Sequence, residues 1–154
     1  MNLCQTWAVK CTQMLEQVVE LIQIPKMLDE RGNLSFMENN NHIPIEIKRV
    51  YWIYDVPGGE LRGGHAYKKL NEVIIALSGS FDVAVDDGSG REQVYQLNRS
   101  YEALYVPKMI WRQLRHFSTN AVALILASRI FEEDDYIYDY SLFHSLVNEK
   151  HNHK

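Results

Sequence analysis

Residues 61–80 read LRGGHAYKKLNEVIIALSGS and contain two runs that are typical of β-strands. The run HAYKKL follows a pair of glycines, and the run EVIIAL is closed by the tight connection SGS. Residues i and i+2 of a strand face the same side, so His65 and Tyr67 project together while Ala66 projects the other way. In a small closed barrel one of those sides is the interior. A histidine and a tyrosine side by side there form a potential proton-transfer pair, because histidine titrates near neutrality and tyrosine can donate or accept a hydrogen bond.

Similar runs continue on both sides of this stretch. They are rich in β-branched and aromatic residues, and turn signals separate them every 8–12 residues or so, which is typical of a sandwich or barrel. The upstream runs are VVELIQI (18–24) and IEIKRVYWIY (45–54). The downstream runs are FDVAVDDGSG (81–90), EQVYQL (92–97), ALYVP (103–107), WRQLRHF (111–117) and AVALILAS (121–128). The sequence therefore predicts an all-β domain.

The two ends of the chain have a different pattern. Apolar residues recur at helical spacing within residues 1–17, which predicts a helical N-terminal extension lying on the domain surface, with a poorly ordered leader as the alternative. The tail EEDDYIYDYSLFHSLVNEKHNHK (132–154) resembles a short closing helix whose solvated acidic start suits a helix N-terminus. We divide the chain into an extension (1–17), a barrel domain with its closing helix (18–146) and a polar tail (147–154).

Length and charge exclude several classes of protein. The 154 residues suit one domain, and 16 basic against 20 acidic residues give a formal charge of −4. That balance argues against a nucleic-acid binder, which needs clustered cations. No apolar run approaches the roughly 20 residues of a membrane helix. The only cysteines, Cys4 and Cys11, indicate reduced thiols, and with no signal peptide we expect a cytoplasmic protein.

The spacing within residues 65–79 resembles the first motif of the cupins. That motif has two histidines one residue apart, a glutamate a few residues later and a glycine after a further strand. The corresponding residues here are His65, Tyr67, Glu72 and Gly79, and Trp111 stands where the second cupin motif has a histidine. Two of the four usual metal ligands are therefore replaced, and one His with one Glu leaves a weak site. We predict a cupin-like jelly roll or β-barrel with no metal and no cofactor.

A longer series of blocks is similar to the sugar nucleotide 3,4-ketoisomerases of the WxcM-like cupin family. The blocks are ERGNL (30–34), IPIEIKRVYWIYD (43–55), LRGGHAYKKL (61–70), LSGSFDVAVDDG (77–88), LYVPKMIWRQL (104–114) and DDYIYDY (134–140). The resemblance covers about residues 18–146. It implies an enzyme that moves the keto group of dTDP-4-keto-6-deoxyglucose from C4 to C3 through an enediol(ate), without a metal or redox cofactor. The product would feed synthesis of a 3-amino sugar for a polysaccharide or a secondary metabolite.

The resemblance also implies which residues are catalytic. The family strand carries His-Ala-His, and both histidines are implicated in proton transfer. The first corresponds to His65, and the second position is Tyr67. A tyrosine has an ordinary pKa of about 10 and is a poor base unless a cation lowers that pKa. It can still act as an acid or donate a hydrogen bond to the enediolate oxygen, so His65 would carry the proton alone.

Further residues are candidates for substrate binding. Arginines suit bidentate contacts with a diphosphate, aromatic rings suit a thymine base, and Glu72 suits a hydrogen-bonding role. The predicted set is Arg31, Arg49, Tyr51, Arg62, Glu72, Tyr105, Trp111 and Arg112. Arg49 and Tyr51 share one strand face and are predicted to line the barrel. The alternatives are that Trp111 packs in the core and that the arginines are solvated surface charges.

The resemblance further implies a homodimer, and the apolar faces of the long β runs need a cover. Whether one subunit contributes to the site of the other stays open. Two other functions also stay open: a catalytically silent sugar nucleotide-binding cupin, which the histidine-to-tyrosine change favours, and an epimerase of a related keto sugar. The product configuration at C4 and the nucleotide preference are not predicted.

Overall fold

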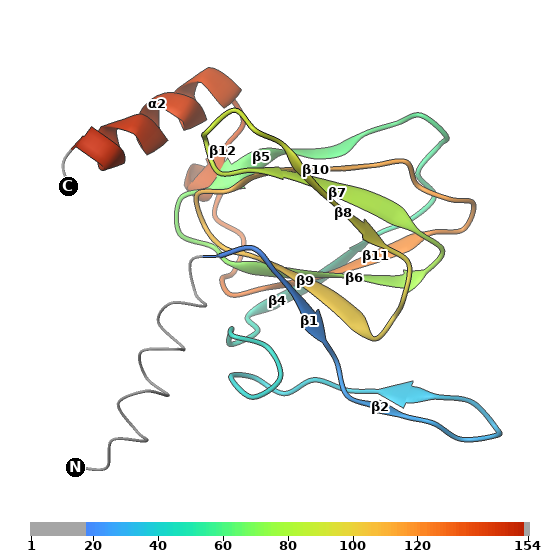
Figure 1. Cartoon of the computed structure of the whole chain (residues 1–154). Coiled ribbons are helices and arrows are strands. Elements are labelled where there is room, and N and C mark those ends of the chain that lie inside the picture. The colour runs from blue at the N-terminus through green and yellow to red at the C-terminus, as the bar shows by residue number, and fades with distance from the viewer. Residues whose placement is uncertain (1–17, 153–154) are drawn as a thin grey trace, which may run out of the picture.

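The computed structural model describes residues 18–152 and consists of two five-stranded antiparallel sheets that face each other (Figure 1). The first sheet has the order β1 (Glu20–Gln23), β9 (Glu102–Val106), β6 (Glu72–Ser78), β11 (Val122–Ala127) and β4 (Arg49–Ile53). The second has the order β12 (Tyr136–Ile137), β5 (Arg62–Tyr67), β10 (Trp111–Arg115), β7 (Phe81–Asp86) and β8 (Gln93–Leu97). The predicted all-β fold is confirmed. The predicted helical N-terminal extension lies outside the described residues.

The main core lies between the two sheets. It is formed by inward residues of neighbouring strands in both sheets, among them Ile74, Val83, Leu104, Leu114 and Ile125, each at most 1% exposed. Burial of this apolar surface is the main force that holds the sheets together. One end of the space between the sheets is polar instead, and that end holds the candidate site.

Strand β6 is buried on both faces, which explains its continuous apolar sequence EVIIAL. Its inward residue Ile74 belongs to the main core, and its outward residues Val73 and Ile75 belong to a second cluster. That second cluster is covered by Ile43 and Ile45 from the segment between β3 (Leu34–Ser35) and β4. Strand β3 pairs with β2 (Lys26–Met27) in a hairpin that projects from the body of the molecule (Figure 1).

The C-terminal segment differs from the predicted closing helix. The acidic run forms a single 3-10 turn, Glu133–Asp135, and the next two residues form β12, which pairs with the end of β5. The helix α2 begins only at Tyr140 and continues through the expected boundary at residue 146 to Asn152. It continues because Phe143 and Val147 pack on Ala66 and Ile137. Among residues 18–152, no helix is long and apolar enough to cross a membrane.

Candidate active site

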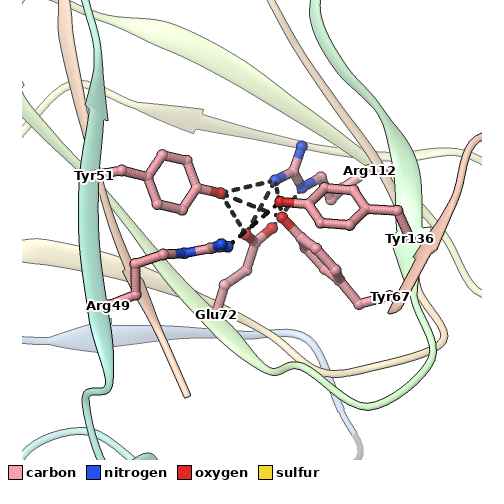
Figure 2. A network of polar contacts seen from close by, with 6 residues as sticks. All are labelled: Arg49, Tyr51, Tyr67, Glu72, Arg112 and Tyr136. Carbon is pink, nitrogen blue, oxygen red and sulfur yellow. Dashed lines mark hydrogen bonds and ion pairs between the residues drawn. The ribbon is translucent and has the colours of Figure 1, made fainter. Parts of the chain in front are cut away.

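Six polar side chains converge at one end of the space between the sheets (Figure 2). They come from five strands: two from β4 and one each from β5, β6, β10 and β12. The six residues are Arg49, Tyr51, Tyr67, Glu72, Arg112 and Tyr136. The shared strand face of Arg49 and Tyr51 does line the barrel, as predicted.

A buried ion pair lies at the centre of this group. Arg112 donates from Nε to Glu72 Oε1 at 2.5 Å and from Nη2 to Glu72 Oε2 at 3.0 Å, and the two side chains are 3% and 1% exposed. Glu72 is on the first sheet and Arg112 on the second, so the bidentate contact joins the sheets. Burial disfavours the charged form of Arg112, but Glu72 outweighs it and the pKa of Arg112 is raised. The arginine is therefore a permanent cation.

Two tyrosines surround this pair and stay protonated. Tyr51 donates to Glu72 Oε2 at 3.2 Å, and Arg112 Nη2 donates to the hydroxyls of Tyr51 and Tyr67 at 3.3 and 3.5 Å. Burial, followed by the charge of Glu72, raises the pKa of both phenols well above its ordinary value. The cation Arg112 acts in the opposite direction but does not prevail. Tyr67 is therefore suited to donate a hydrogen bond and not to accept a proton as a base.

His65 lies beside this network and is 8% exposed. Three aromatic rings surround it, with centroids 4.8 Å (Tyr67), 4.9 Å (Tyr136) and 5.8 Å (Tyr138) from the imidazole. Burial, and then the charge of Arg112, lowers the pKa of His65 to about 3, against a smaller opposing effect of the Gly63 backbone. Its Nε2 atom is buried and has no hydrogen-bond partner. At neutral pH the imidazole is uncharged, and Nε2 is available to accept a proton.

Sequence reasoning missed two tyrosines of the site. Tyr136 accepts a hydrogen bond from Arg49 Nη2 at 3.4 Å, and its ring stacks on that of Tyr138 with centroids 5.3 Å apart. Tyr138 is 60% exposed and faces solvent at the edge of the site. The signal in the sequence is the alternation of tyrosines in YIYDY (136–140), which is the period of a strand and not of a helix.

Four of the predicted binding residues lie away from these six side chains in the single chain. Arg31 pairs with Asp29 at the end of the β2–β3 hairpin and its side chain is 90% exposed, and Arg62 is exposed at the start of β5. Tyr105 is buried on the outward face of the first sheet. Trp111 packs under α2, because the alternation along β10 points its neighbour Arg112 inward.

The described residues offer few candidate metal ligands. Within the described part of the chain, no three His, Cys, Asp or Glu side chains form a group that could hold a metal ion. The cupin-motif glutamate, Glu72, is engaged by Arg112 and Tyr51. Gly79, at the end of the same motif, has φ +64° and connects β6 to β7, a conformation that favours glycine. The absence of a metal from the mechanism stays a prediction.

Comparison with known proteins gives consistent matches over almost the whole described chain. The family model described as "FdtA: WxcM-like, C-terminal" matches residues 17–148. A TDP-4-oxo-6-deoxy-alpha-D-glucose-3,4-oxoisomerase from Aneurinibacillus thermoaerophilus is 40% identical over 128 residues, which are 83% of this chain and 91% of the relative.

Two solved structures are similar in both fold and sequence. A 3,4-ketoisomerase from Helicobacter canadensis has a TM-score of 0.82 and 39% identity, over 86% of this chain and 98% of that one. A point mutant of the 3,4-ketoisomerase QdtA from Thermoanaerobacterium thermosaccharolyticum, in complex with TDP-4-keto-6-deoxyglucose, has a TM-score of 0.83 and 33% identity. It is matched over 86% of this chain and 95% of that one.

The buried ion pair generates a prediction about stability. Arg112→Met leaves the carboxylate of Glu72 buried without its cation, so we expect the free energy of unfolding to fall by about 3–5 kcal/mol. The double variant Glu72→Leu/Arg112→Met removes both charges, and we expect it to be less destabilised than the sum of the two single variants. Urea denaturation of the four proteins measures this coupling. Additive losses would show that the two groups do not stabilise each other.

Proposed function

The chain belongs to the FdtA family of WxcM-like C-terminal domains, and we propose that it is an isomerase that moves the keto group of dTDP-4-keto-6-deoxyglucose from C4 to C3. The observation that carries this proposal is His65: an uncharged imidazole with an unpartnered Nε2, beside the Tyr67 hydroxyl, a donor that is held by a buried cation. The relatives with 33–40% identity are named as 3,4-ketoisomerases or oxoisomerases, and one of them has TDP-4-keto-6-deoxyglucose bound.

Deprotonation at C3 is the first step of the proposed mechanism. His65 Nε2 accepts the proton from C3, the electron pair of that C–H bond forms the C3–C4 double bond, and the carbonyl oxygen at C4 becomes an enolate. The Tyr67 hydroxyl, polarised by Arg112, is the donor that stabilises the developing negative charge, because the proton of Tyr51 is already donated to Glu72. No metal or redox cofactor is needed, because the substrate keeps all its electrons.

Reprotonation at C4 completes the isomerisation. The imidazolium of His65 returns the proton to C4, the hydroxyl at C3 loses its proton and becomes the carbonyl, and the oxygen at C4 takes up a proton. One base serves both carbons because C3 and C4 are bonded neighbours. Tyr67 therefore acts as a donor to the oxygens, and the second histidine of the family strand is not required.

The outer surface of the first sheet supports a homodimer. Val50 and Trp52 on β4 and Leu77 on β6 are 48%, 59% and 50% exposed there. The β2–β3 hairpin adds Met27 and Leu28, which are 61% and 74% exposed. An apolar surface of this kind marks an interface, and a second copy of the chain is the partner that covers it. The exposed Arg31 stands on the same hairpin, so a role in substrate binding requires it to reach the barrel of the second copy.

Proton NMR in D2O tests the proposed reaction. Incubation of the protein with dTDP-4-keto-6-deoxyglucose is expected to give the 3-keto isomer with deuterium incorporated, at a rate that is level from about pH 5 to pH 8. The rate is level because His65, with a pKa of about 3, is uncharged across that range and is lost as a base only at lower pH. His65→Asn should lower the rate by about 10²–10⁴-fold, whereas His116→Asn, an exposed histidine paired with Asp82, should not.

Two results would contradict this reaction, and a third would contradict the lowered pKa of His65. Binding of the substrate with neither exchange nor a new sugar would indicate a silent binding protein. Deuterium exchange at C3 without migration of the keto group would indicate an epimerase. A decrease in rate centred near pH 6.5 would show that His65 titrates as an ordinary solvated histidine.

Tyr67→Phe tests whether the tyrosine hydroxyl acts on the reacting oxygen. The variant keeps the ring contacts with His65 and Tyr136 and removes only the hydroxyl. We expect kcat to fall by roughly a hundredfold, which is the effect of losing one preorganised donor to an oxyanion. A kcat within twofold of that of the unmodified protein would show that Tyr67 only packs against the base.

The homodimer is tested by light scattering coupled to size-exclusion chromatography. We expect a mass of twice 18.0 kDa for the chain and a shift towards one chain for Trp52→Asp, since a charge in a desolvated interface is unfavourable. Glu46→Ala, on an exposed polar side chain close to the start of β4, is the control that should remain a dimer. A single-chain mass for the unmodified protein at micromolar concentration would contradict the proposal.

A further inference from the structure

One acidic side chain connects the C-terminal segment to the end of the His65 strand. We call residues 132–138 the strap; it includes the 3-10 turn, β12 and the two tyrosines that surround His65. Asp135, in the strap, is 4% exposed. Its carboxylate accepts hydrogen bonds from the backbone N–H groups of Lys69 at 2.7 Å and Leu70 at 3.1 Å. These two residues come shortly after Tyr67, the last residue of β5.

The backbone around Asp135 reinforces this attachment. Lys68 donates from its backbone N–H to the Asp135 carbonyl at 2.9 Å and from Nζ to the Asp134 carbonyl at 2.6 Å. Directly after Asp135, Tyr136 pairs with Tyr67 across the β12–β5 ladder. The carboxylate therefore fixes the turn after β5 and the start of β12 relative to each other.

We propose that Asp135 is a positioning residue, which clamps the strap to the end of β5 and so holds Tyr136 and Tyr138 against the His65 imidazole. The proposal rests on the proposed function of His65 as the base, but it makes a separate statement about what shapes the surroundings of that base. Asp135 touches neither His65 nor the place of the reacting atoms, and acts only through the strap.

The clamp matters because β12 is short: apart from its ladder with β5, it is held by the packing of Ile137 on Phe143 and Val147 and by the bond from Arg49 to Tyr136. Only two residue pairs join it to β5, and a two-residue strand contributes few hydrogen bonds of its own. Without the carboxylate, the N–H groups of Lys69 and Leu70 lose their acceptor, and for Leu70, which is 2% exposed, an unsatisfied buried amide is unfavourable. Asparagine does not replace aspartate here, since it offers one acceptor oxygen and directs an NH2 group at the other N–H.

Release of the strap changes the electrostatic surroundings of His65. The groups that face the imidazole are Tyr67 on β5, Arg112 on β10 and the strap tyrosines Tyr136 and Tyr138. The two strap tyrosines move away when the clamp is lost, and water then reaches the ring. The burial that lowers the pKa of His65 is weakened, so this pKa moves up towards its ordinary value of about 6.5. The base is then protonated at a higher pH than in the intact protein.

The matched control is Asp86→Asn. Asp86 is 9% exposed, accepts hydrogen bonds from the backbone N–H groups of Gly88 and Gly90, and binds the Tyr140 hydroxyl at 2.5 Å. It is a buried carboxylate with two backbone donors, and it holds the same C-terminal segment to the barrel. It attaches the start of α2 to β7, and its hydrogen bonds do not involve the strap.

The experiment compares Asp135→Asn with Asp86→Asn in the full chain. We measure the melting temperature, kcat and KM for isomerisation from about pH 2 to pH 8, so that the range includes the lowered pKa of His65, and the titration of the His65 imidazole by NMR over the same range. We expect Asp135→Asn to lower kcat by roughly ten- to a hundredfold with KM changed less than threefold, as for a misplaced catalytic group. In this variant the fall of kcat at acidic pH and the His65 titration should both move to higher pH. Asp86→Asn should lower the melting temperature by a comparable amount. It should leave the acid limb of the kcat profile and the His65 titration at the pH values of the unmodified protein.

The proposal is overturned if both variants lose activity in proportion to their loss of stability and neither moves the His65 titration. It is also overturned if Asp135→Asn moves KM alone. If Asp135→Asn does not fold, Lys68→Met decides: it removes only the exposed bond to the Asp134 carbonyl, and a two- to threefold fall in kcat with an upward shift of the His65 titration is expected. An inactive unmodified protein refutes the proposed function, whereas the NMR titration still tests the clamp.

Discussion

The ion pair between Glu72 and Arg112 is the constraint on which the rest of the site depends. It places a full positive and a full negative charge between two sheets that are otherwise held together by apolar side chains. Such a pair is tolerated only where both partners are also hydrogen-bonded, because desolvation of each charge is unfavourable. The hydroxyls of Tyr51 and Tyr67 meet that requirement. The polar end of the barrel is therefore a closed network and not a set of independent side chains.

The network moves the pKa values of the phenols and of the His65 imidazole in opposite directions. The loss of water and the buried carboxylate raise the pKa of the two phenols and keep them protonated, and burial together with the buried cation lowers the pKa of His65 and keeps its imidazole uncharged. The groups of the candidate site therefore hold one protonation state through the neutral pH range. Pairs of titratable groups whose pKa values are moved apart in this way are typical of acid–base sites.

The alternation of residues along single strands was predictable from the sequence, and contacts between distant segments were not. The i, i+2 spacing of His65 and Tyr67 predicts their shared face, and the two rings do lie together, with centroids 4.8 Å apart. Trp111 was a candidate for the site because one strand alone does not reveal which of its faces is inward. Asp135 lies in an acidic run that suggests a solvated helix start, and it is buried only because a turn 65 residues away supplies two N–H groups.

In the proposed mechanism, a tyrosine at position 67 changes the chemistry of this strand but leaves it able to catalyse the isomerisation. A second imidazole beside Arg112 would also be driven to its uncharged form, and the site would then hold two acceptors and fewer fixed donors. The phenol in that position is held by the same arginine and keeps its proton, because its pKa is raised. In the proposed mechanism His65 accepts and returns a proton at carbon, and Tyr67 supplies a hydrogen bond to oxygen. On this proposal the exchange of histidine for tyrosine divides the two roles between two residue types, and the Glu72–Arg112 pair is what holds each of them in its protonation state.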